Sequence, residues 1–422
     1  MSFFWLRIGC YWERFRKWGV KGVCSFFISK YKKMESDRRI LALAPKPYPK
    51  PIHGFTLVGT FSKTNSLSKV MRDLAYALKQ VGIPYQILDL SDEQNTALEK
   101  DLSEINIPPY KDIHLCKYTN ILEMEDCPLP LDAPVKRSRI CFWEFDTGLV
   151  EEFPALLKCR EIIGMSDYNC EVFRKTFPPT VAVRKMLYPF RANVPALESV
   201  AVIREKYGLG RGDFVVFFNF DFESWADRKN PEGAMHAFAH AFKDTQDAKL
   251  VFKTMNAKRF PDQVSSLQNL AETLGIDDRF MTINNYIPTA DLYGLTNACD
   301  VYISLHRGEG FGLGIAEAMS LGKPVVVTDY SSTTEFCNKG NAIVVPYKVV
   351  SVPQNAMVHP NYLFVKKWAE PDICAAANGL KRLYDEPEYR EQLGKKAKAT
   401  IEEYFSLGNF KDSVMAFWTS CS

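Results

Sequence analysis

The order of apolar and polar residues along this chain predicts two successive α/β halves. Short β-branched and aromatic runs alternate with stretches of 8–14 residues that have helical spacing of apolar positions. In the first half we expect a helix at 67–80 and strands at 55–59, 85–88, 113–116, 140–143 and 161–165. In the second half we expect strands at 214–220, 249–253, 281–284, 301–305 and 325–328, and helices at 231–242, 263–273, 289–298 and 314–321. Residues 184–196, which contain Pro189 and Pro195, are predicted to be a linker.

Strands that alternate with helices pair in parallel and are covered by helices on both faces. The fold class we predict is therefore α/β, with two doubly wound Rossmann-like domains that face each other across a cleft. Ligands of such sheets bind beyond the carboxyl ends of the strands. We expect an N-terminal domain over 53–195, a C-terminal domain over 196–400, and a helix over 401–422 that returns to the N-terminal domain.

The first 52 residues do not follow this pattern. If residues 4–21 are helical, a step of about 100° per residue gathers aromatic and aliphatic side chains on one side and basic ones on an adjoining side. Residues 1–39 contain ten Lys or Arg and three Asp or Glu, and a proline-rich connector follows. We expect residues 1–39 to bind an anionic membrane surface. The alternative is that this helix packs on the protein's own surface.

Charge and cysteine content limit where in the cell the protein is expected and which partners it is expected to bind. The net charge is only +3, and since the basic excess lies in residues 1–39, the remainder is acidic and no nucleic-acid binding is expected. The 11 cysteines are odd in number and none has CxxC spacing, which favours a reducing compartment. No apolar run is long enough for a membrane helix. We therefore expect a cytoplasmic protein, peripheral on the inner face of the membrane.

The most informative stretch is residues 306–319, with the sequence HRGEGFGLGIAEAM. Four glycines between 308 and 314 follow a predicted buried strand and precede a predicted helix. Backbone amides of such a loop can approach an anion at the helix N-terminus. Glu309 lies in the loop and Glu317 about one turn into the helix, and we expect both to face the cleft.

These two acids, together with Gly-Lys-Pro-Val at 322–325 and Thr-Asp-Tyr-Ser at 328–331, resemble the signature of retaining glycosyltransferases of family 4, which have the GT-B fold. Residues 221–222, 228–231 and 368–372 resemble other segments of that family, and residues 54–59, 82–84 and 142–144 resemble the acceptor half of its bacterial polysaccharide members. The resemblance implies transfer of a sugar from a nucleotide-sugar donor to a saccharide or lipid-linked acceptor, in cell-surface polysaccharide synthesis.

The resemblance also implies roles for individual residues. Lys229 would neutralise the donor diphosphate, Glu309 would hold hydroxyls of the transferred sugar, and Glu317 would bind the ribose. The other implied donor-binding residues are Arg228 and, through their amides, Gly310, Phe311, Gly312 and Leu313. Candidates for acceptor binding are Trp143, Glu144 and His114. Packing at the strand end is the alternative for Trp143, and a structural role is the alternative for His114.

The sequence contains no DxD triplet, the usual metal-binding signature of the other large glycosyltransferase fold, so we expect no divalent metal and no other cofactor. Fixed cations and amide dipoles would stabilise the leaving diphosphate instead. Ser224 stands where family members often have an arginine, and Arg228 is either its replacement or a surface group. Two other functions remain open: a non-catalytic subunit that binds nucleotide sugar or serves as a membrane scaffold, and a GT-B sugar-nucleotide epimerase.

Overall fold

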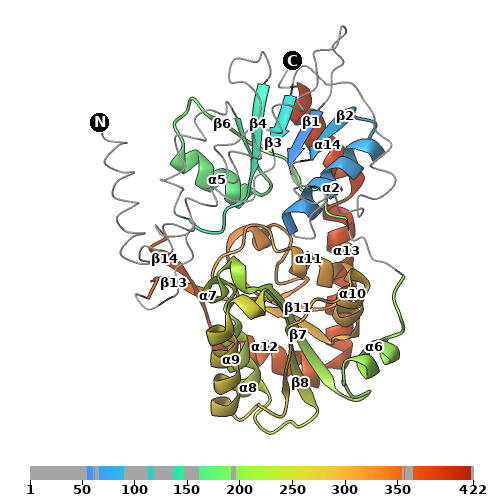
Figure 1. The fold of residues 1–422 in the computed structure, drawn as a ribbon, viewed down its shortest axis with the longest axis vertical. Coiled ribbons are helices and arrows are strands. Elements are labelled where there is room, and N and C mark those ends of the chain that lie inside the picture. The colour runs from blue at the N-terminus through green and yellow to red at the C-terminus, as the bar shows by residue number, and fades with distance from the viewer. Residues whose placement is uncertain are drawn as a thin grey trace.

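Each half of the chain forms a six-stranded sheet in the computed structural model (Figure 1). The structure describes residues 55–59, 61, 66–89, 113–116, 136–146, 161–191, 196–353, 356 and 365–419. The predicted extension and connector at 1–52 lie outside the described residues. We call residues 55–191 the first half and residues 196–404 the second half.

The sheet of the first half has the strand order β2-β1-β3-β4-β5-β6, and all neighbouring strands are parallel. Its strands are β1 (Phe55–Gly59), β2 (Tyr85–Asp89), β3 (Ile113–Cys116), β4 (Lys136–Cys141), β5 (Glu161–Gly164) and β6 (Ala182–Lys185). Helix α2 (Ser66–Gln80) packs on β1 and β2, and helix α5 (Asp167–Thr176) packs on β5 and β6. The apolar positions of α2 recur at helical spacing and are buried: Val70, Met71, Leu74, Ala75 and Leu78.

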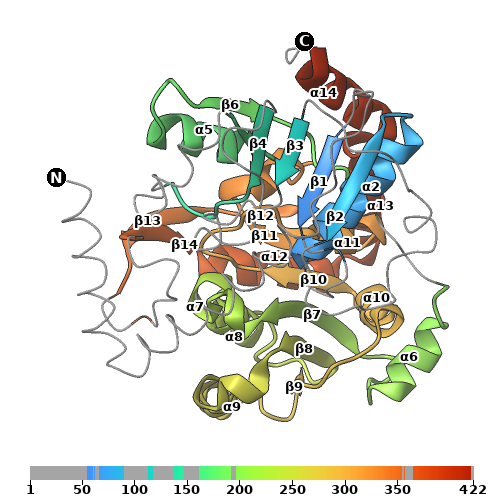
Figure 2. The same ribbon diagram turned by 45° about the horizontal axis from the view of Figure 1, so that its top comes forward.

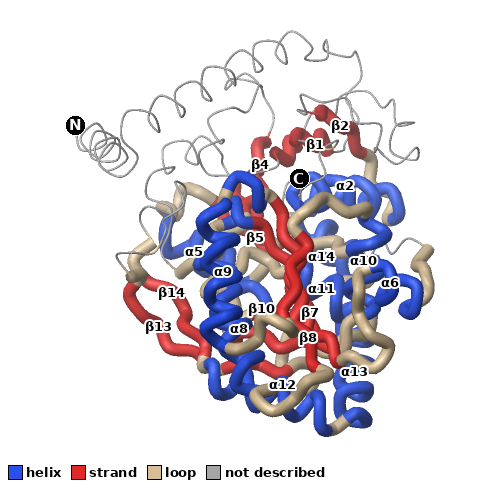
Figure 3. Tube along the Cα trace, turned by 60° about the horizontal axis from the view of Figure 1, so that its bottom comes forward, coloured by secondary structure: helices blue, strands red, loops and turns tan. Residues whose placement is uncertain are grey.

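The sheet of the second half has the order β12-β11-β10-β7-β8-β9 and is also parallel. Its strands are β7 (Phe214–Asp221), β8 (Ala248–Met255), β9 (Phe280–Ile283), β10 (Val301–Ser304), β11 (Val325–Thr328) and β12 (Ile343–Val345). Helices α8 (Pro231–Ala241), α9 (Pro261–Leu274) and α12 (Ile373–Asp385) lie on one side of this sheet. The opposite side holds α6 (Val200–Lys206), α10 (Thr289–Ala298), α11 (Leu313–Ser320) and α13 (Pro387–Tyr404), as Figure 3 shows.

Two further elements lie outside the two sheets. An antiparallel pair of strands, β13 (Tyr347–Ser351) and β14 (Lys367–Pro371), extends from one side of the second half (Figure 2). At the end of the described chain, α14 (Leu407–Thr419) contacts α2 of the first half. There the Leu187 amide donates to Ser413 Oγ at 2.8 Å. Within the described residues, none of the helices has the length and apolar character needed to span a bilayer.

The α/β fold with two doubly wound sheets is confirmed. The predicted linker at 184–196 is partly wrong, because Ala182–Lys185 is the edge strand β6 of the first sheet. All four of its residues are half-buried, and the short sequence AVRK lacks the apolar run that marks the other strands. The elements α5, β12, β13 and β14 were not predicted from the sequence.

Candidate functional site

The candidate site lies beyond the ends of β7 and β10, which are neighbours in the middle of the second sheet. The strand order reverses at this pair, since β8 and β9 follow on one side while β11 and β12 follow on the other. Segments that leave the strands at such a point diverge, so a ligand can bind between them. After β7 the chain forms the single turn α7 (Ala226–Lys229), and after β10 it forms the glycine-rich loop that leads into α11.

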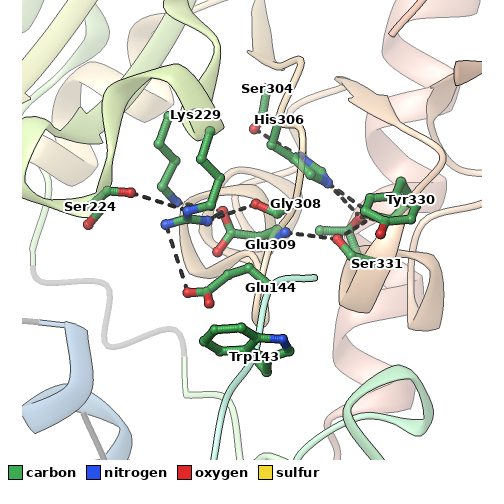
Figure 4. Close-up of polar contacts among 12 residues, drawn as sticks. Trp143, Glu144, Ser224, Lys229, Ser304, His306, Gly308, Glu309, Tyr330 and Ser331 are labelled. Atoms are coloured by element: carbon green, nitrogen blue, oxygen red, sulfur yellow. Dashed lines mark hydrogen bonds and ion pairs between the residues drawn. The ribbon is translucent and has the colours of Figure 1, made fainter. Parts of the chain in front are cut away.

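Four charged side chains meet between these two segments (Figure 4). Lys229 Nζ lies 2.5 Å from Glu309 Oε2, and Arg228 donates to the Gly308 carbonyl at 2.7 Å. Arg228 also lies 3.6 Å from Glu309 and 3.9 Å from Glu144, which comes from the first half. Two cations and two carboxylates are therefore held together, with both cations on α7.

Electrostatics keep Glu309 ionised. Burial alone would raise its pKa, but Lys229 and Arg228 outweigh burial and lower the pKa to about 2. The ionised form therefore stabilises the fold above pH 4.5, the ordinary pKa of a glutamate, and this contribution is lost as the pH falls toward 2. Burial lowers the pKa of Lys229, and Glu309 opposes that shift. An ionised carboxylate accepts hydrogen bonds only, which suits it to sugar hydroxyls.

His306 lies at the start of the glycine-rich loop, and the sequence pattern predicts no role for it. It is fully buried, and burial lowers its pKa to about 4. Its Nε2 lies 3.1 Å from the Tyr330 carbonyl, which can only accept, so Nε2 carries the proton. Nδ1 lies 3.3 Å from Ser304 Oγ. The neutral ring thus joins the end of β10 to the segment after β11.

The folded state should become less stable as the pH falls, because His306 is buried in its neutral form. An unfolded histidine titrates near pH 6.5, so the unfolded chain binds more protons than the folded one between that pH and about 4. The free energy of unfolding should drop by roughly 3 kcal/mol as the pH falls through this interval. We expect H306Q to remove that part of the slope in urea unfolding measured at a series of pH values. An unchanged slope would contradict the assignment.

The glycine-rich loop prepares the N-terminus of α11 for an anion. Gly312 is the N-cap with φ 96°, in the left-handed region, and it has no side chain to cap the helix. The first-turn amides of α11 have no carbonyl partner within the helix, which makes this end an anion-binding site in principle. A Cβ on Gly314 would lie 2.4 Å from Tyr302 Oη, so this glycine is required for packing.

Glu317 and Phe311 both face the first half of the chain. Glu317 Oε1 accepts from Tyr293 Oη at 3.0 Å. Burial raises the pKa of Glu317, Lys69 of α2 opposes this, and Asp73 of α2 adds to it. The Phe311 ring, 7% exposed, packs 4.5 Å from the Tyr188 ring. The loop is therefore anchored on the first half, and the amides of Gly310–Leu313 remain candidates for donor binding.

The other residues proposed from the sequence for donor or acceptor binding do not all lie at this site. Arg228 is 3% exposed and its Nε donates to the Ser224 carbonyl at 3.2 Å, so it is no surface group. Trp143 is 4% exposed, and its ring packs edge-on against the Phe145 ring, with 6.1 Å between the ring centroids. This agrees with the alternative interpretation, packing at the end of a strand, and leaves little of the ring face for a sugar. His114 lies on β3, and its side chain is outside the described part. In the described ranges no three His, Cys, Asp or Glu side chains gather as metal ligands.

Residues 202–353 match the family model described as Glycosyl transferases group 1. This part of the chain is similar to a group 1 glycosyltransferase domain. It contains α7, the glycine-rich loop and α11, and thus Lys229, Glu309 and Glu317.

Curated proteins that match part of this chain include mannosyltransferases. The lipopolysaccharide core biosynthesis mannosyltransferase LpsB of Rhizobium meliloti is 32% identical over 119 residues, 28% of this chain and 32% of that protein. The serotype-specific mannosyltransferase WbdA of Escherichia coli is 26% identical over 125 residues, 30% of this chain and 15% of that protein. The chain thus spans a third or less of the length of these relatives.

Solved structures resemble nearly the whole chain. Anabaena HepE, crystallised with UDP and glucose, has a TM-score of 0.62 at 15% identity and covers 87% of this chain and all (100%) of its own. Sucrose-phosphate synthase from Thermosynechococcus elongatus has a TM-score of 0.62 at 14% identity, with 87% of this chain and 99% of its own covered. The likeness confirms that the two halves of the chain together have a GT-B fold.

Proposed function

We propose that the protein is a retaining glycosyltransferase that transfers a sugar from a nucleotide-sugar donor to a saccharide or lipid-linked acceptor in cell-surface polysaccharide synthesis. The observation that carries the proposal is the Lys229–Glu309 pair beside the N-terminus of α11, within a group 1 glycosyltransferase domain. Support for the substrate class comes from LpsB, named for lipopolysaccharide core biosynthesis, and from HepE, which was crystallised with UDP and glucose.

The donor diphosphate would bind between α7 and the N-terminus of α11. Lys229, with Arg228 beside it, would supply positive charge, and the amides of Gly310–Leu313 would supply hydrogen-bond donors. As the bond between sugar and phosphate breaks, negative charge grows on the leaving diphosphate, and fixed charges and dipoles stabilise it with little reorganisation. Phosphate would compete for Lys229 and thereby release the Glu309 carboxylate for hydroxyls of the transferred sugar. Glu317 would accept from the ribose hydroxyls.

Retention would follow from attack on the face that the leaving group occupies. The bond from the anomeric carbon to the phosphate oxygen breaks through an oxocarbenium-like state, and the acceptor oxygen bonds to the same face. The acceptor's proton passes to the leaving phosphate, so no protein nucleophile is required. The enzyme would need no divalent metal. Residues 1–39 would hold it on the cytoplasmic face of an anionic membrane.

Screening nucleotide sugars tests this proposal. A ligand that binds only the folded state raises the melting temperature, so we expect at least one nucleotide sugar in a panel of UDP, GDP, ADP and CMP donors to give a clear shift. With that donor, sugar transfer to lipid-linked saccharide acceptors should continue in EDTA, and NMR of the product should show the donor's anomeric configuration. Binding without turnover on any acceptor would favour a scaffold role, and an inverted product would contradict the retaining mechanism.

A further inference from the structure

We propose that Trp225 is a positioning residue through which the first half of the chain and the β13–β14 pair hold Arg228 and Lys229 in place. Trp225 has φ 62° and ψ 92°. A bulky side chain rarely adopts a positive φ, and such backbone persists only where its surroundings enforce it, most often at functional sites. The strained residue comes immediately before the turn that carries both cations of the candidate site.

The backbone of Trp225 determines the direction of α7. Its carbonyl accepts from the Arg228 amide at 3.0 Å and from the Lys229 amide at 3.3 Å. A helix of one turn is not stable by itself, because nucleation costs more than a single turn regains. The positions of Arg228 and Lys229 therefore depend on whatever fixes Trp225.

The Trp225 ring is fixed from two sides. It is 2% exposed, and its centroid lies 5.8 Å from the Phe145 ring of the first half and 5.5 Å from the Trp368 ring of β14. Its Nε1 donates to Asp227 Oδ2 at 3.0 Å, which ties the ring to the turn that it precedes. These rings belong to an apolar cluster that also includes Trp143 and, from α5, Phe173.

Arg307 provides a second connection between β14 and the same turn. Its guanidinium forms a bidentate pair with Glu370 at 2.7 and 2.8 Å and lies 4.5 Å from the Trp368 ring centroid. The same group donates to the Asp227 carbonyl at 2.8 Å. Thus β14 supports α7 through an aromatic contact and through a charge-assisted network.

Contact between the halves is consequently part of the phosphate-binding site. Phe145 reaches Trp225 only while the halves are docked, so their separation removes one of the two supports of the strained residue. Lys229 then loses the backbone geometry that aligns it with Glu309. The inference rests on the proposed function for the identity of the ligand, but the coupling of Phe145 to α7 does not depend on it.

Hydrogen exchange and ligand binding test the coupling together. Phe145→Leu should speed exchange of the Arg228 and Lys229 amides at least tenfold and weaken binding of inorganic pyrophosphate at least fivefold. Phe173→Leu is the matched control, since Phe173 is fully buried in the same cluster and packs on Phe177 at 6.2 Å within the first half. Phe173→Leu should lower the melting temperature about as much as Phe145→Leu does. It should change neither the exchange of the two amides nor the affinity for pyrophosphate. In a Trp225→Phe background, Phe145→Leu should have a smaller effect than in the wild type.

Equal effects of the Phe145 and Phe173 variants on these amides would overturn the positioning role. So would an undiminished effect of Phe145→Leu in the Trp225→Phe background, since this indicates a route that bypasses Trp225. A third outcome separates the two proposals. If amide exchange changed in the variants as expected but the wild-type protein did not bind pyrophosphate, the positioning role would be supported and the proposed function contradicted.

Discussion

Glu309→Gln is expected to reduce the rate of sugar transfer roughly a thousandfold while the protein stays folded. The amide cannot supply the charge that faces Lys229, which lies 2.5 Å from the carboxylate. A donor phosphate would still be attracted to Lys229 and Arg228, but the sugar would lose the anionic acceptor that orients its hydroxyls. We therefore expect the loss mainly in kcat, measured by release of nucleoside diphosphate in the presence of acceptor.

Glu335→Gln is the matched control for this variant. Glu335 has a side chain 10% exposed and lies 2.7 Å from Lys185, so the substitution breaks a comparable ion pair between the halves. The melting temperatures of the two variants should be similar, and only the Glu309 variant should lose transfer. Retention of more than a tenth of the wild-type rate by Glu309→Gln would contradict the assigned role.

Gly308→Ala is expected to reduce transfer about a hundredfold by separating the halves at the site. A Cβ on Gly308 would lie 2.4 Å from the Glu144 carbonyl oxygen and 3.1 Å from Phe145 Cε1. The first of these atoms is backbone, so no rotamer change relieves the clash, and the segment at Glu144 must move. A shift of about 1 Å is enough to misalign a reacting group, and the fold should lose about 1–3 kcal/mol.

Gly212→Ala serves as the control, because its Cβ would meet nothing within 4 Å. We expect this variant to keep the wild-type transfer rate and melting temperature. The new methyl group would meet the other half in Gly308→Ala and would meet no atom within 4 Å in Gly212→Ala. If Gly308→Ala retained the wild-type rate, the contact between Glu144 and the loop would have no part in catalysis.

Strands with long apolar runs could be predicted from the sequence because their pattern is local. The strand expected at 214–220 is β7 (Phe214–Asp221), and the helix expected at 231–242 is α8 (Pro231–Ala241). Strand β6 was missed because AVRK is polar and half-buried at a sheet edge. The strands β13 and β14 were missed because they are separated by many residues, with no tight turn to mark a hairpin.

The chemistry of the site was predictable only in part. Lys229 and Glu309 are 80 positions apart, and a family resemblance rather than any local pattern suggested that they meet. The packing of Trp225 on Phe145 and the contact of Gly308 with Glu144 depend on how the two halves dock. Docking geometry leaves no periodic signal in a single sequence, so these contacts emerge only from the structure.

The most direct test of diphosphate binding at Lys229 compares a nucleoside diphosphate with the monophosphate of the same base. The base is that of the donor giving the largest thermal shift, and dissociation constants are measured by calorimetry for the wild type and Lys229→Met. We predict that the wild type binds the diphosphate at least tenfold more tightly and that Lys229→Met loses most of this preference. An undiminished preference in Lys229→Met would contradict the assignment of the diphosphate site.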